Sequence, residues 1–228
     1  MTELAVAALF LPASHFGISS SPLRGRLIAV IGERPFQGLY SVISLAAFAW
    51  LIVAYRHAGL HLVWIAPPWV KLAASPLVLA AFLLVVIGVT TPNPTTVGAE
   101  SLFERSGTVH GVLRVTRNPF LWGTSLWAAA HIAANGDVAS ILFFGSIGAL
   151  GLCGASLLDA KKARQHGAGW QRFAAETSSV PFLAILQGRQ RFAIGELGAW
   201  RVVLALALFA VLLVTHQKLF GVSPFSEW

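Results

Sequence analysis

Six stretches of the chain are apolar over nearly the whole length needed to cross a bilayer, and polar or proline-containing segments separate them. A helix needs roughly 20 residues to span a hydrocarbon core of about 30 Å. The pattern therefore predicts an all-α, polytopic membrane bundle of about six helices. The predicted spans are Leu4–Leu23, Phe36–Tyr55, Val70–Thr90, Phe120 to just before Asn135, Val138–Leu158 and Trp200 to about Thr215.

The connections between these spans carry their own signals. Pro92 and Pro94 follow the third span and end its helix. Asn135-Gly136-Asp137 is a tight-turn sequence, which predicts that the fourth and fifth spans form an antiparallel hairpin. Segment Ala99–Val115 mixes polar and apolar residues, and we expect a helix near the membrane interface.

The fifth span leads into a charged segment, Asp159–Gln187. We expect it to continue the helix into the cytoplasm, to break at Gly167 or Gly169, and to end in a short helix on the membrane surface. We treat residues 1–228 as a single membrane domain, with segments 99–119 and 159–199 on the cytoplasmic side.

Composition supports the membrane assignment. Hydrophobic residues make up 56% of the 228 residues and charged residues only 11%, with a mean hydropathy of +0.73. A soluble domain needs far more charge on its surface, so a soluble enzyme is excluded. The single cysteine, Cys153, excludes a disulfide framework, a thiolate zinc site and a four-cysteine iron–sulfur site.

The net charge of +7 is distributed unevenly. Basic residues concentrate after the first, third and fifth spans, and because Lys and Arg are retained in cytoplasmic loops, both termini are predicted to lie outside. The basic composition therefore requires no nucleic-acid partner. The residues on the predicted cytoplasmic side are Arg24, Arg26, Arg34, Arg105, Arg114, Arg117, Lys161, Lys162, Arg164, Arg172, Arg189 and Arg191.

Two histidines, His15 and His131, lie inside the apolar spans. Ionisable side chains in a membrane are costly and are commonly functional. Eleven residues, about 16 Å of helix, separate His15 from Leu4 and His131 from Phe120. If the two spans start on opposite sides, both rings come near mid-depth, where two imidazoles can serve as axial ligands of a haem iron.

Other interpretations of these histidines stay open. Each ring can instead bond a backbone carbonyl or a Ser on a neighbouring helix. Asn135 follows His131 by only four residues, which favours a shallower position for His131. Arg114 and Arg117 precede the fourth span, where their guanidinium donors can hold a carboxylate, a phosphate or a lipid headgroup.

The block Val115–Gly123, continued through Trp127, His131 and Asn135-Gly136-Asp137, resembles the NnrU family of integral membrane proteins. His15 with Pro22-Leu23-Arg24 resembles the beginning of that family, and Ser179-Val180-Pro181-Phe182 its end. The resemblance implies a bacterial inner-membrane protein linked to denitrification and nitric oxide metabolism.

The same domain forms a 15-cis-zeta-carotene isomerase that carries haem b. The resemblance therefore implies haem b, with His15 and His131 at the positions of the iron ligands. We also assign Arg114, Arg117, Asn118 and Trp127 to cofactor binding. Asn118 stands where the family commonly has His, and Ala128 stands where the isomerase has Cys. The activity implied is electron transfer or sensing by a bis-histidine haem, with a membrane redox partner, and a carotene isomerase-like haem enzyme is an alternative.

Two further alternatives belong to other classes. Arg117-Asn118-Pro119 and the late Gly167–Phe173 and Val180-Pro181 patterns are similar to membrane methyltransferases that use S-adenosylmethionine. An assembly factor without a cofactor is the third interpretation. Purification in mild detergent distinguishes the three interpretations. A Soret band supports the haem protein, binding of S-adenosylmethionine supports the methyltransferase, and neither result supports the assembly factor.

Overall fold

The structure is a computed structural model that describes residues 1–105 and 107–224, and its regular elements there are helices. Long helices alternate with short helical turns. The elements are α1 Thr2–Ser19, α2 Pro22–Ile31, α3 Glu33–Arg56, α4 Pro68–Thr90, η1 Glu100–Glu104, α5 Val112–Val115, α6 Pro119–Asn135, α7 Val138–Glu176, α8 Leu183–Leu186, η2 Ile194–Leu197 and α9 Ala199–Phe220.

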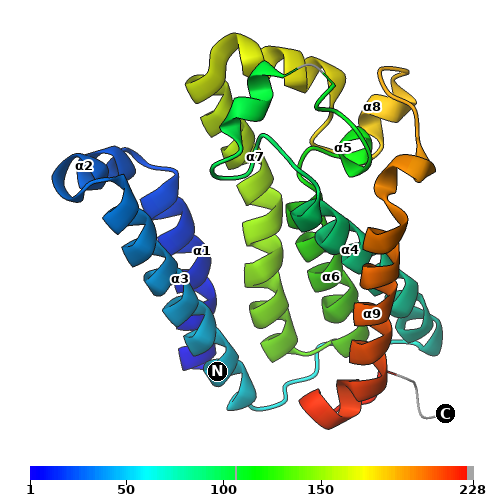
Figure 1. The fold of residues 1–228 in the computed structure, drawn as a ribbon. Coiled ribbons are helices and arrows are strands. Elements are labelled where there is room, and N and C mark those ends of the chain that lie inside the picture. The colour runs from blue at the N-terminus through cyan, green and yellow to red at the C-terminus, as the bar shows by residue number, and fades with distance from the viewer. Residues whose placement is uncertain (106, 225–228) are drawn as a thin grey trace.

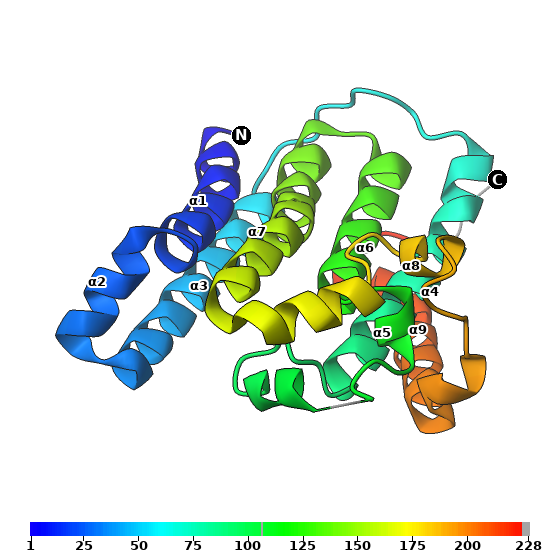
Figure 2. The same cartoon turned by 90° about the horizontal axis from the view of Figure 1, so that it is seen from above.

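The long helices lie along a common direction, and the short helices α2, α5 and α8 gather at one end of the bundle (Figure 1). Helix α1 begins at the opposite end, where α9 also ends and where α6 turns into α7. Seen from above, α1 and α3 lie on one side of α7, and α6, α4 and α9 lie on the other (Figure 2). The contacts agree, because α1 touches α3 and α7, α6 touches α4 and α7, and α4 touches α9.

Five of these helices, α1, α3, α4, α7 and α9, are long and apolar enough to cross a membrane. Helix α6 has 17 residues, about 25 Å of rise, and lies between α4 and α7. The predicted antiparallel hairpin of α6 and α7 is confirmed. The chain is a multi-pass membrane protein, while the count of six spans and their orientation stay predictions.

Many large apolar side chains on the long helices are exposed on the outside of the bundle, as expected for a protein surrounded by lipid. Leu9 is 71% exposed, Leu72 is 72% exposed and Val214 is 79% exposed. In water, surface patches of this kind would associate or aggregate. The buried core is instead narrow, and in α9 the only buried residue is Ala205. Lipid therefore solvates the outside of α1, α4 and α9.

The first span is shorter than predicted. It ends at Ser19, and the residues up to Leu23 belong partly to a second helix, α2. Ser21 is the N-cap of α2, since its Oγ accepts a hydrogen bond from the Leu23 N–H at 3.2 Å, and Pro22 occupies the first helical position. The run Ser19-Ser20-Ser21 is therefore a boundary between two helices.

The helix expected over Ala99–Val115 was wrong. Among the described residues of this segment, 99–105 and 107–115, η1 and the single-turn helix α5 are the helical elements. Gly107 and Gly111 between them have φ values of 72° and 58°, which a continuous helix cannot contain. Phe103 nevertheless reaches into a small core with Trp170 and Phe173, so the segment is anchored.

The predicted break after the fifth span is confirmed. Gly167 has φ 44° and ψ −114° inside α7, which bends the helix there. The part beyond the bend is more buried than expected of a surface helix, because Trp170 and Phe173 are 7% and 5% exposed. The last span also runs further than predicted, to Phe220, and stops at Gly221 with φ 78°.

Candidate functional site

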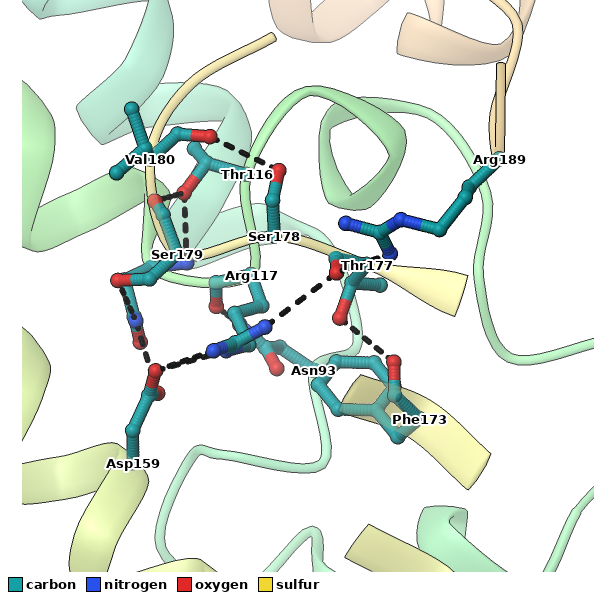
Figure 3. Close-up of polar contacts among 11 residues, drawn as sticks. Asn93, Thr116, Arg117, Asp159, Phe173, Thr177, Ser178, Ser179, Val180 and Arg189 are labelled. Atoms are coloured by element: carbon teal, nitrogen blue, oxygen red, sulfur yellow. Dashed lines mark hydrogen bonds and ion pairs between the residues drawn. The ribbon is translucent and has the colours of Figure 1, made fainter. Parts of the chain in front are cut away.

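A buried polar network joins three segments at the end of the bundle that carries the short helices (Figure 3). At its centre, Arg117 donates to one carboxylate oxygen of Asp159, from Nε at 2.9 Å and from Nη2 at 2.6 Å. Arg117 precedes α6, and Asp159 lies on α7. The side chains are 14% and 16% exposed, so the ion pair is largely shielded from solvent.

Asn118 extends the network to the segment after α7. Its Nδ2 donates to Asp159 Oδ1 and to Ser179 Oγ, both at 3.1 Å. Two further bonds run to the same segment, from the main-chain Arg117 N to the Ser178 carbonyl at 2.9 Å and from the side-chain Thr116 Oγ1 to the Ser179 carbonyl at 2.6 Å. The loop before α6 is therefore fixed both to the middle of α7 and to the segment that follows α7.

The remaining donor group of Arg117 is also directed at the protein. Nη1 donates to the Thr177 carbonyl at 3.4 Å, and the guanidinium lies 5.2 Å from the ring centroid of Trp170. The guanidinium group of Arg117 therefore binds a carboxylate of this chain, that of Asp159. Its predicted contact with a cofactor stays a prediction.

Two buried polar atoms near the start of α6 have no partner among the residues that the structure describes. They are Asn118 Oδ1 and Trp122 Nε1, one helical turn apart. An acceptor and a donor buried without partners cost free energy, about 1–3 kcal/mol each. A buried water or a polar ligand group can satisfy them, which keeps Asn118 among the candidate binding residues.

Arg114 makes a second, separate ion pair. Its Nε and Nη2 donate to the two carboxylate oxygens of Glu196 at 2.7 and 3.0 Å, and Gly111 N donates to the same carboxylate at 2.9 Å. The hydrogen bonds from Arg114, followed by that from Gly111, lower the pKa of Glu196 to about 2. The sequence did not indicate this pair, because Glu196 is far along the chain in η2.

His131 and Trp127 are brought together, one turn apart on α6. His131 Nδ1 lies 2.8 Å from the Trp127 carbonyl oxygen. The imidazole stacks on Phe144 of α7, with 4.7 Å between centroids and 25° between planes, and lies 4.7 Å from the Trp127 ring. Nδ1 is therefore oriented by the backbone, while Nε2 has no hydrogen bond within the described residues.

His15 has a similar local arrangement on α1. Its Nδ1 lies 2.8 Å from the Leu11 carbonyl oxygen, and its ring meets Tyr40 of α3 edge-on at 5.6 Å between centroids. Both predicted ligands are half-buried, and both have a ring nitrogen occupied by a carbonyl four residues earlier. The bond to the carbonyl is the usual way in which a ligating histidine is oriented.

The two histidines lie at different levels of the bundle. His131 lies against Phe144, whereas Ser19, one turn beyond His15, lines a cavity with Lys161. Lys161 is seventeen residues beyond Phe144 on α7, which is about 26 Å of rise. Ligation of one iron by both histidines stays a prediction.

No group of three or more His, Cys, Asp or Glu side chains suited to a metal ion occurs in the described part of the chain. A metal held by protein side chains alone therefore has no ready site there. A haem differs, because the porphyrin supplies most of the ligands and the protein adds only one or two.

The family model for NnrU, described as NnrU protein, matches residues 3–224. The chain belongs to the NnrU family. The match includes both histidines and both arginine ion pairs. No solved structure matches this chain.

Two plant proteins are similar over part of the chain. The chloroplastic 15-cis-zeta-carotene isomerase of Arabidopsis thaliana is 37% identical over 81 residues, which is 35% of this chain and 22% of that protein. The isomerase of Zea mays is 32% identical over 83 residues, 36% of this chain and 22% of that protein. The NnrU chain therefore aligns with only about a fifth of these relatives' length.

Proposed function

We propose that this NnrU protein is a membrane haem b protein in which His131 is the iron ligand. The observation that carries the proposal is the His131 ring itself. Its Nδ1 is fixed on the Trp127 carbonyl, its face lies on Phe144, and its Nε2 is left unbonded within the described chain. An oriented imidazole in apolar surroundings is suited to bind a haem iron.

A single histidine ligand is the form that this arrangement fits. Ligation by both His15 and His131 is the alternative form, and the two single-histidine variants distinguish the two. When bound, haem supplies an iron that can exchange electrons or bind a small diatomic molecule. With one protein ligand, a coordination position stays open, which favours sensing or metabolism of nitric oxide over electron transfer alone.

The proposed location is the cytoplasmic membrane of a bacterium, where nitric oxide reduction takes place, with a membrane redox partner. Lipid-exposed helices α1, α4 and α9 support a membrane location. The two similar plant proteins are chloroplastic by name, so the compartment is part of the proposal.

The test is the absorption spectrum of the full chain purified in mild detergent after expression with haem supply. We expect a Soret band, a pyridine haemochrome spectrum of haem b, and a shift of the Soret band when nitric oxide is added to the reduced protein. Binding of S-adenosylmethionine without a Soret band would instead support the methyltransferase alternative. Absence of both would favour an assembly factor.

A second candidate is isomerisation of a polyene in the bilayer. The similarity to 15-cis-zeta-carotene isomerases favours it, and the aromatic rings of Trp127 and Phe144 beside His131 suit a flat apolar substrate. Incubation of the reduced protein with 15-cis-zeta-carotene, followed by chromatography of the isomers, tests it. Ala128 stands where the resemblance places a cysteine of the isomerase, so turnover would have to proceed without that thiolate, and absence of turnover would rule this candidate out.

A further inference from the structure

A cavity of about 470 Å³ lies where α1 ends, α2 begins and α7 passes both helices. It is distinct from the two histidines and from the Arg117 network. The residues that line it are Ser19, Ser20, Ser21, Pro22, Arg24, Gly25, Lys161, Arg164 and Gln165. Three of these side chains are cations and none is an acid.

The positive charge of this cavity is poorly compensated. Arg24 pairs with Glu33 at 3.2 Å, but the Glu33 side chain is 59% exposed, so that carboxylate is well solvated. Lys161 and Arg164 have neither a hydrogen bond nor an ion pair among residues 1–105 and 107–224. The positive charges of Arg24 and Lys162 and the more weakly acting negative charges of Glu100 and Glu33 all act on Lys161 from a distance. The next residue, Lys162, shows the contrast, because it is buried and paired with Glu100 at 3.0 Å.

The donors point to a ligand with several charged oxygens. Lys161, Arg164 and Gln165 are spaced by three and four residues on α7, which places them on one face of the helix. Ser20 Oγ contacts only the Ser19 hydroxyl, at 3.4 Å, and can donate to a ligand. Arg, Lys and hydroxyl donors around one cavity are typical of a phosphate site.

We infer that this cavity binds the phosphate headgroup of an anionic membrane lipid. The cavity lies at the end of α1, a helix whose outer face is exposed for lipid. Basic pockets at the ends of membrane helices commonly bind such headgroups. The bound phosphate tethers α2 and α7, two helices that otherwise have few direct contacts. This inference is independent of the haem proposal.

The experiment uses the full chain in detergent with short-chain phosphatidic acid as the probe, short-chain phosphatidylcholine as the neutral-headgroup comparison, and inorganic phosphate as the free-anion arm. We expect saturable binding of phosphatidic acid, and about tenfold weaker binding by the double variant Lys161→Gln/Arg164→Gln, since hydrogen bonds to charged groups are strong. Arg26→Gln is the matched control, because Arg26 is exposed on α2 and does not line the cavity. It should bind within about twofold of the unchanged protein.

Equal binding by the double variant and the unchanged protein would overturn the site. Inorganic phosphate that binds as tightly as phosphatidic acid would overturn the lipid assignment in favour of a free phosphate. If the double variant does not fold, Arg164→Gln alone, at an exposed position, is measured instead, and a rise in melting temperature with phosphatidic acid should be smaller in it than in Arg26→Gln.

Discussion

Arg117 and Asp159 form a closed ion pair in which two guanidinium nitrogens share one carboxylate oxygen, at 2.6 and 2.9 Å. Asn118 occupies the other oxygen of Asp159 at 3.1 Å. The pair fixes the loop before α6 to the helix that follows it. The Arg117–Asp159 pair therefore stabilises the packing of this end of the bundle.

Replacement of Arg117 by Ala should then destabilise the protein. The variant leaves Asp159 as a largely shielded charge with only Asn118 as a partner, and breaking a buried pair in this way costs about 3 kcal/mol. Thermal unfolding of Arg117→Ala in detergent, compared with the exposed control Arg26→Ala, measures the difference. Normal stability with loss of haem would show instead that Arg117 contacts the cofactor.

The pair of Arg114 and Glu196 should make stability depend on pH. Hydrogen bonds from Arg114 hold the pKa of Glu196 at about 2, below its ordinary value of 4.5. The stabilisation is complete above pH 4.5 and is lost as the pH falls toward 2, because protonation of Glu196 breaks the pair. The carboxylate is partly solvated, so the effect is modest.

The measurement is the melting temperature from pH 6 to pH 3 for the unchanged protein and for Glu196→Gln. We expect the unchanged protein to be the more stable at pH 6 and the two curves to approach each other as the pH falls. Curves that run parallel would show that Glu196 contributes nothing through its charge.

Gly136 is predicted to be irreplaceable in the turn between α6 and α7. Its φ is 70°, and a Cβ there would collide with the Trp64 carbonyl, whose segment packs against the turn. Gly221 is a matched control, with φ 78° but open space around it. Gly221→Ala should cost about 1 kcal/mol from backbone strain alone, and Gly136→Ala clearly more.

Haem content in the folded fraction distinguishes a structural turn from a binding turn. Gly136→Ala protein that still folds should retain haem in proportion to the folded amount. Loss of haem at unchanged melting temperature would place the turn in the cofactor site.

The orientation in the membrane is a further prediction. Helix α1 begins and helix α9 ends at the same end of the bundle. The excess of Lys and Arg lies at the opposite end, which is the predicted cytoplasmic side. Reporter fusions at the C-terminus should therefore report a periplasmic location, and fusions after Gly188 a cytoplasmic one. The reverse pattern of reporter activity would contradict the predicted orientation.

The helices were predictable because apolar runs of bilayer length and the breakers between them are local features. Gly167 and the Asn135–Asp137 turn are examples, since a glycine or a turn sequence acts on its own neighbours. The boundary at Ser19 could have been found too, because Ser21-Pro22 is a cap followed by a helix start.

The long-range pairs were not predictable from spacing. Glu196 meets Arg114 only because the chain at Gly111–Arg114 lies against the backbone and side chain of Glu196. The equal depth of His15 and His131 rested on measuring each from the start of its span. Asn135, which ends α6 one turn after His131, favours a shallower position for this ring, and the depth of both rings stays a prediction.

The most direct test of the haem proposal compares His131→Ala with His15→Ala in the same detergent preparation. His131 should be required, so His131→Ala should lose the Soret band while its helical circular dichroism is kept. Because the proposal has His131 as the one protein ligand, His15→Ala should keep the band and its position. A normal Soret band in His131→Ala would contradict the account, and loss of the band in both variants would show that the two histidines ligate one iron after all.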